Sequence, residues 1–252
     1  MFELEVSIAL ILVAVAFVSG FVDAIAGGGG SLTIPALLMA GVPPHVALGT
    51  NKLAGSFGSL TACITYIRRG LFNPWEWKIH VVFTAIGAVV GTLLAHWISP
   101  EWLNRILPLL VIIVALFSLF QRYWPTHFQT HHQHKGTAAV QGLVLGGYDG
   151  VAGPGTGAFW TLTNRMFYGM DLLHAIGATK LMNFTSNVIS LVTFLWLGHV
   201  HLLMGTLMGI FIMTGAYVGA LVAIKAPTKW ISLGFNLIVI AIAARLIYQY
   251  WL

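Results

Sequence analysis

Long apolar runs separated by short polar stretches set the pattern of this chain. Eight of these runs are read as helices that cross a membrane, since about 20 apolar residues span the hydrocarbon core of a bilayer. They comprise residues 5–26, 46–67, 79–98, 103–121, 137–152, 174–197, 201–224 and 229–251. The pattern therefore predicts an all-α polytopic membrane protein with about eight long transmembrane helices.

Two further apolar segments, residues 31–42 and 155–168, are short. At about 1.5 Å per residue, the first covers about 18 Å, well below a hydrocarbon core of about 30 Å. Each lies beside a glycine-rich stretch that an ordinary helix does not contain, because every interior glycine costs about 1 kcal/mol relative to alanine. We expect two short helices that are either broken crossings or re-entrant segments.

The order of the motifs indicates an internal repeat. Asp23 precedes one glycine break and Asp149 precedes another, 126 residues later. Lys52 and Lys180 follow these breaks and lie 128 residues apart. An acid, a glycine break and a lysine thus recur in the same order, with a shift of two residues between the motifs. A duplicated structural unit explains this regularity better than chance does.

A polar connector at residues 123–136 lies near the midpoint of the chain and carries four histidines. These are His127, His131, His132 and His134. Their spacing is irregular and no cysteine or acid supports them, so a solvated loop is favoured over a metal cluster. We therefore predict a first transmembrane repeat at 1–122, the His-rich connector at 123–136, and a second repeat at 137–252.

The lysines and arginines indicate how the repeats are oriented. If the short segments cross, each repeat has five crossings and the second begins on the opposite side of the membrane. An N-terminus outside then places eight basic residues inside: Arg68, Arg69, Lys78, Arg122, Lys135, Arg165, Lys225 and Lys229. With re-entrant short segments, Lys225 and Lys229 instead lie opposite Arg68. Because basic residues gather on the cytoplasmic side, an inverted five-plus-five repeat is favoured.

Composition agrees with a membrane location. Of 252 residues, 58% are hydrophobic and 8% are charged, against about 25% charged in an average soluble domain. The pI of about 9.5 by itself suggests a nucleic-acid partner. The twelve lysines and arginines lie mostly between apolar runs, however, where a positive-inside bias explains them. We expect a multi-pass protein whose surroundings are the lipid bilayer, with no nucleic-acid partner.

The glycine breaks are candidate anion sites, because a helix N-terminus presents free backbone N–H groups and a positive dipole end. The candidate residues at the two breaks are Gly28, Gly29, Gly30 and Ser31, and Gly155, Thr156 and Gly157. The alternative is that glycine only allows close helix packing. That alternative suits the four-residue spacing of Gly87 and Gly91 and of Gly215 and Gly219.

Charged and amide side chains near the breaks extend the candidate site. Asp23 and Asp149 either couple a proton or cation, or act as structural acids at the breaks. Lys52 and Lys180, at matching places in two long spans, either neutralise an anionic substrate or extend toward the membrane surface. Three amides accompany the lysines at close spacing, and we expect them to line a polar inner surface: Asn51, Asn183 and Asn187.

Motifs of catalysis are not found. The glycines at 27–30 lack the Gly-Lys-Ser/Thr ending of a phosphate-binding loop, and the chain has no Gly-x-Ser-x-Gly and no His/Cys metal spacing. We therefore expect neither an enzyme nor a cofactor or metal site.

Four segments carry a family resemblance: GFVDAIAGGGGSLTIPAL from Gly20, ALGTNKL from Ala47, YDGVAGPGTG from Tyr148 and ATKLMNFTSN from Ala178. Together they resemble the sulfite exporter TauE/SafE family of bacterial membrane permeases. The resemblance implies a multi-pass transporter of the bacterial inner membrane whose substrates are small sulfur-containing anions such as sulfite or sulfonates.

The sequence thus predicts a secondary transporter that exports a small anion, with a site between the two repeats and coupling to a proton. Two alternatives stay open. An anion channel would share the site without proton coupling, and a cation or metal permease would use the acids and the histidines.

Overall fold

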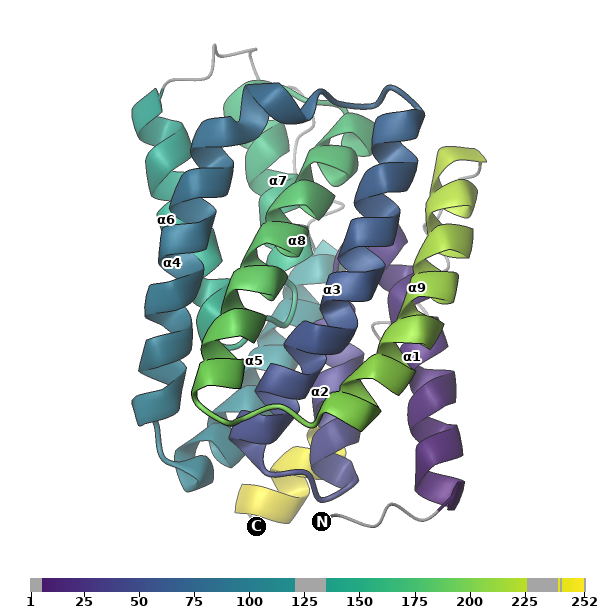
Figure 1. Ribbon diagram of the computed structural model, residues 1–252, viewed down its shortest axis with the longest axis vertical. Helices are drawn as coiled ribbons and strands as arrows, with labels where there is room; N and C mark the ends of the chain where they lie inside the picture. Colours follow the sequence, from purple (N-terminus) through teal and green to yellow (C-terminus); the bar gives the residue numbers. More distant parts are fainter. Residues whose placement is uncertain (1–5, 121–134, 226–239, 241, 252) are drawn as a thin grey trace.

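The computed structural model describes residues 6–120, 135–225, 240 and 242–251, and this part of the chain contains helices and no strand (Figure 1). The helices before the gap at 121–134 are α1 (Val6–Ala26), α2 (Gly30–Met39), α3 (Pro44–Arg68), the 3₁₀ helix η1 (Pro74–Trp77), α4 (Lys78–Trp97) and α5 (Pro100–Phe120). Those after it are α6 (Lys135–Val151), α7 (Thr156–Tyr168), α8 (Leu172–Trp196) and α9 (Leu202–Lys225). Residues 242–251 are also helical.

The predicted segments match these helices closely. Each of α1 to α9 begins and ends within three residues of its predicted segment. The all-α prediction is therefore confirmed for the described residues. About half of the predicted helix at 229–251 lies outside the described residues. So does the predicted connector at 123–136, except for its last two residues, which begin α6.

Four helices are long and apolar enough to cross a membrane: Ser7–Ile25, Pro74–Trp97, Pro100–Leu119 and Leu202–Lys225. Helices α3 and α8 have 25 residues each and are long enough, but they are not among these four. Polar residues such as Lys52 and Lys180 lower their hydropathy. Within the described residues, four of the eight predicted spans are thus found as candidate spans, and the other four stay predictions.

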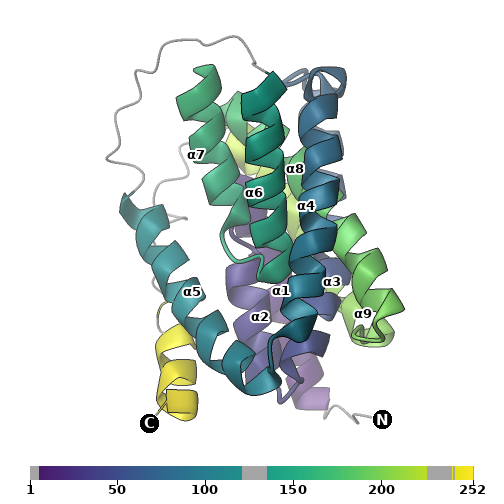
Figure 2. The ribbon, with the colours of Figure 1, turned by 90° about the vertical axis from the view of Figure 1, so that its left-hand side faces the viewer.

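Helices that precede the gap at 121–134 pack against helices that follow it. Helix α1 packs along α9 and α4 packs along α6, while α3 and α8 lie between these pairs and contact each other (Figures 1 and 2). The largest apolar core includes Leu37, Leu48 and Phe194, from α2, α3 and α8. The site between the helices is therefore assembled from both parts of the chain.

Glycines allow the interlocked helices to approach closely. A Cβ on Gly91 of α4 would lie 2.0 Å from the carbonyl oxygen of Gly147 in α6. One on Gly219 of α9 would lie 2.2 Å from the carbonyl oxygen of Phe21 in α1. Both distances are too short for any side chain. The prediction that these spaced glycines serve helix packing is confirmed.

The outward face of α4 is apolar. Val82, Ile86, Val90 and Leu94 recur at four-residue spacing and are 47–55% exposed. Such a stripe is costly in water and suits contact with lipid tails. The glycines of the same helix face inward, so α4 has one face for lipid and one for α6.

Two helical hairpins enter the bundle from opposite ends. Helix α2 runs back toward the end at which α1 begins, at the bottom of Figure 1, and α7 runs back toward the end at which α6 begins, at the top. Gly27 and Gly153 in the two turns have φ of +76° and +88°, which only glycine adopts readily. The turns touch, because a Cβ on Gly157 would lie 2.6 Å from the Cα of Gly27.

Candidate functional site

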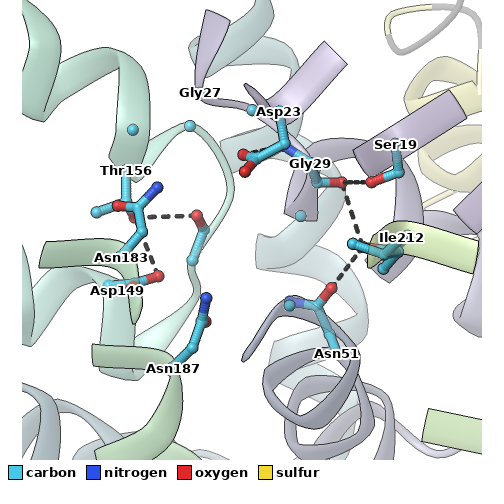
Figure 3. A pocket seen from close by; sticks show the side chains of 17 residues that line it. Ser19, Asp23, Gly27, Gly29, Asn51, Asp149, Thr156, Asn183, Asn187 and Ile212 are labelled. Atoms are coloured by element: carbon cyan, nitrogen blue, oxygen red, sulfur yellow. Dashed lines mark hydrogen bonds between the residues drawn. The ribbon is translucent and has the colours of Figure 1, made fainter. Parts of the chain in front are cut away.

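A cavity of about 40 Å³ lies where the two glycine turns meet (Figure 3). That volume suits a few water molecules or an ion of a few atoms. Eleven of the predicted site residues line it: Asp23, Gly28, Gly29, Gly30, Asn51, Asp149, Gly155, Thr156, Gly157, Asn183 and Asn187. In the view of Figure 3, Asp149, Thr156, Asn183 and Asn187 lie on one side and Asp23, Gly29 and Asn51 on the other. The structure thus brings residues 126 or more positions apart around one space.

Three predicted residues do not line the cavity. Ser31 is buried, and its hydroxyl has no hydrogen-bond partner among the described residues. Lys52 and Lys180 are 1% and 0% exposed. Since their aspartate partners line the cavity and they do not, the lysines lie behind the carboxylates.

The two lysines pair crosswise with the two aspartates. Lys52 Nζ lies 2.8 Å from Asp149 Oδ1, and Lys180 Nζ lies 2.9 Å from Asp23 Oδ2. Each ammonium also donates to the backbone carbonyl of the same aspartate. Each pair therefore ties one part of the chain to the other. Because a buried charge without a partner is strongly destabilising, neither pair can be broken without compensation.

Each aspartate also holds the turn that follows it. The backbone N–H of Gly29 donates to Asp23 Oδ1 over 2.9 Å. The hydroxyl of Thr156 donates to Asp149 Oδ1 over 3.2 Å. Charge-assisted bonds of this kind are stronger than neutral ones, so the carboxylates shape the glycine turns as well as pairing with the lysines.

The three amide side chains differ in how many of their polar atoms already have a hydrogen-bond partner. Thr33 donates its hydroxyl to Asn51 Oδ1, and Asn187 Nδ2 donates to Ser59 Oγ over 3.4 Å. Asn183 is 7% exposed, and its Oδ1 is buried without a hydrogen-bond partner among the described residues. Buried polar atoms are normally paired. Asn183 Oδ1 is therefore placed to accept a hydrogen bond from a water molecule or from a ligand that carries a donor.

Six lining residues are not among the predicted site residues: Ser19, Gly27, Thr33, Gly55, Gly153 and Ile212. Gly27, Thr33 and Gly153 lie in or beside the predicted breaks. Ser19 lies four residues before Asp23 and Gly55 lies four after Asn51, so helical spacing could have placed them on the same faces. Ile212 carries no polar signal. It reaches the cavity only because α9 packs on α1 and α3.

The described residues contain no group of three or more His, Cys, Asp or Glu side chains placed to hold a metal ion. The histidines of the predicted connector lie outside the described residues.

Apolar helices that can cross a membrane, together with two hairpins that meet at a polar cavity, indicate a multi-pass membrane protein. The model of the family described as "Sulfite exporter TauE/SafE" matches residues 12–246. The chain belongs to the TauE/SafE family, and the resemblance noted from its motifs is confirmed.

Curated relatives match along most of their length. The chain is 42% identical over 236 residues to "Probable membrane transporter protein ORF9" of Sinorhizobium sp, covering 92% of this chain and 89% of that protein. It is 36% identical over 240 residues to "Probable membrane transporter protein YfcA" of Escherichia coli (strain K12), covering 95% and 89%. It is 37% identical over 222 residues to "Probable membrane transporter protein" of Haemophilus influenzae, covering 86% of each. The protein is thus a membrane transporter of this family, not an enzyme.

Proposed function

We propose that the protein is a secondary transporter that exports small sulfur-containing or organic anions, such as sulfite or sulfonates, across the bacterial inner membrane. The observation that carries the proposal is the buried cavity at the meeting point of the two glycine turns, flanked by two crossed lysine–aspartate pairs. The family name supports sulfite as the first substrate to test.

The lining of the cavity suits a small oxyanion. The N-terminal turns of α2 and α7 point toward it, and helix N-termini favour negative charge. The amide of Asn183 and the hydroxyl of Thr156 add polar groups. A volume of about 40 Å³ favours anions of a few atoms over large organic acids.

Charge in the site supports proton coupling. An anion 4 Å from a carboxylate is repelled by about 4 kcal/mol at an effective dielectric constant of about 20. A proton on the aspartate removes this repulsion and leaves its lysine without a counterion. The anion then takes the place of the carboxylate beside the ammonium. One anion and one proton therefore bind together without a net change in buried charge. They move in the same direction, so export occurs when the outward gradient of the anion exceeds the inward gradient of the proton.

Alternating access fits an inverted repeat. The hairpins α1–α2 and α6–α7 enter from opposite ends of the bundle, and the lysine–aspartate pairs are exchanged between the two parts of the chain. Such reciprocity is what two repeats related by a two-fold axis in the membrane plane would produce. Rocking one repeat against the other would expose the cavity to each side in turn.

Sulfite flux in proteoliposomes tests the proposal. Lys52→Ala and Lys180→Ala should each lower the flux at least about tenfold, because each leaves a buried carboxylate unpaired. Lys78→Ala is the matched control, since Lys78 is exposed at the start of α4. Unchanged flux in both buried-lysine variants would overturn the site.

A pH gradient separates the transporter from a channel. A transporter coupled to protons should accelerate sulfite movement when the gradient is imposed, whereas an anion channel with the same cavity should not respond. No observation in the described residues favours the cation or metal permease.

A further inference from the structure

The two crossed ion pairs have unequal surroundings. The Asp149 side chain is 6% exposed and accepts from three side chains: Lys52 and Thr156 at Oδ1 and Ser186 at Oδ2. The Asp23 side chain is 20% exposed. Among the described residues, it accepts from one side chain, Lys180 at Oδ2, and from the backbone N–H of Gly29 at Oδ1. Asp149 is therefore enclosed by donors, and Asp23 keeps oxygen lone pairs open toward the cavity.

The difference comes from two positions in the sequence. Ser186 lies six residues after Lys180, and the matching position six residues after Lys52 is Gly58. A Cβ on Gly58 would lie 2.3 Å from Ile212 Cγ2. A serine therefore does not fit there unless the Ile212 side chain or α9 shifts. Packing between α3 and α9 thus prevents the first carboxylate from gaining the hydroxyl that the second one has.

We infer that the two pairs have different tasks in the transport cycle: Asp23–Lys180 opens, and Asp149–Lys52 stays closed. This inference rests on the proposed function. A proton from water adds to a carboxylate oxygen of Asp23, the contact with Lys180 breaks, and the Lys180 ammonium pairs with the anion. Asp149 keeps its proton-free carboxylate and braces the α6–α7 hairpin against α3. Asp23 is the proton-accepting group, and Ser186 is a positioning residue for Asp149.

Bond counting explains the division of tasks. Opening the second pair requires a proton on Asp149, whose carboxylate accepts charge-assisted bonds from a lysine, a threonine and a serine and is 6% exposed. Opening the first pair requires a proton on Asp23, whose carboxylate accepts from one lysine and one backbone N–H and is 20% exposed. The pair with fewer donors and more exposure opens first.

Flux of radiolabelled sulfite tests the inference in proteoliposomes, with two readouts. One is the ratio of flux with and without a pH gradient, and the other is exchange of labelled for unlabelled sulfite at equal pH. Asp23→Asn should bring the ratio to about one while slower exchange remains measurable, because asparagine imitates the protonated acid. Asp149→Asn should lower the exchange at equal pH and the flux driven by the gradient at least about tenfold each.

Ser186→Ala keeps the test decisive if Asp149→Asn fails to fold. In this variant Asp149 loses one hydrogen-bond donor, so the protein should melt at a lower temperature. The ratio of flux with and without the gradient should stay as in the wild type. The inference is overturned if Asp23→Asn retains the response to the gradient, or if Ser186→Ala loses it.

A measurement without substrate separates this inference from the proposed function. Gly30 lines the cavity, and a Cβ there would meet its nearest atom, Asn51 Nδ2, at 3.5 Å, an ordinary contact. In Gly30→Cys combined with Cys63→Ala, maleimide labelling should rise on acidification as the Asp23 pair opens. Labelling here means the rate of reaction divided by that of a free thiol at the same pH, because maleimide reacts with the thiolate. Adding Asp23→Asn should make labelling independent of pH, and adding Ser186→Ala should not. Wild-type protein that carries no sulfite would refute the proposed function. Labelling that still depends on pH in the Asp23→Asn background would refute the inference.

Discussion

Replacing Lys52 by methionine measures how much the buried ion pair contributes to the stability of the bundle. The lysine is 1% exposed and its Nζ lies 2.8 Å from Asp149 Oδ1. Methionine keeps much of the volume and removes the charge. Among the described residues, the side chains that still donate to the buried Asp149 carboxylate are then Thr156 and Ser186. Breaking a buried pair in this way costs about 3–5 kcal/mol.

The corresponding fall in melting temperature is about 6–20 °C, at about 2–4 °C per kcal/mol for a chain of this size. A thermal-shift measurement on the purified protein in detergent records it. The double variant Lys52→Met, Asp149→Asn should recover most of the loss, because it leaves no unpaired charge. Lys78→Met, at an exposed site on α4, should stay within about 0.5 kcal/mol of the wild type. A single variant that melts like the Lys78 control would refute the reasoning, as would a double variant no more stable than the single one.

Two further predictions concern helix packing and pH. Gly91→Ala places a Cβ 2.0 Å from the backbone of α6 and should destabilise the protein by about 1–3 kcal/mol. As a control, Gly136→Ala, whose Cβ would meet nothing within 4 Å, should have the melting temperature of the wild type. Equal melting temperatures for the two variants would contradict the packing argument. The pKa of His199, in the connection between α8 and α9, is lowered by burial and then by the neighbouring His45 and His96. The unfolded chain then binds more protons in mild acid, so stability is complete above about pH 6.5 and is lost as the pH falls toward the folded pKa. His199→Gln should therefore flatten the dependence of melting temperature on pH between about 7.5 and 5, and an unchanged slope would refute this.

Local patterns in the sequence determined where the helices lie and where they break. Hydropathy depends on a residue's own side chain and its near neighbours, so apolar runs located α1 to α9 within three residues. The turn at Gly27 followed from the chain's own backbone, because consecutive glycines cannot sustain a helix. The matched order of Asp23, Asp149, Lys52 and Lys180 also marked the residues that gather around the cavity.

Only the tertiary structure decided which of these residues face each other. A buried lysine requires a counterion, but its own helix does not specify which one. The crosswise choice, Lys52 with Asp149 and Lys180 with Asp23, depends on how α3 and α8 pack between the two hairpins. The same packing put Ser186 against one aspartate and left the other beside open space. Helical periodicity assigns a residue to a face, whereas contacts between helices far apart in the chain assign its partner, and those contacts gave two similar motifs different surroundings.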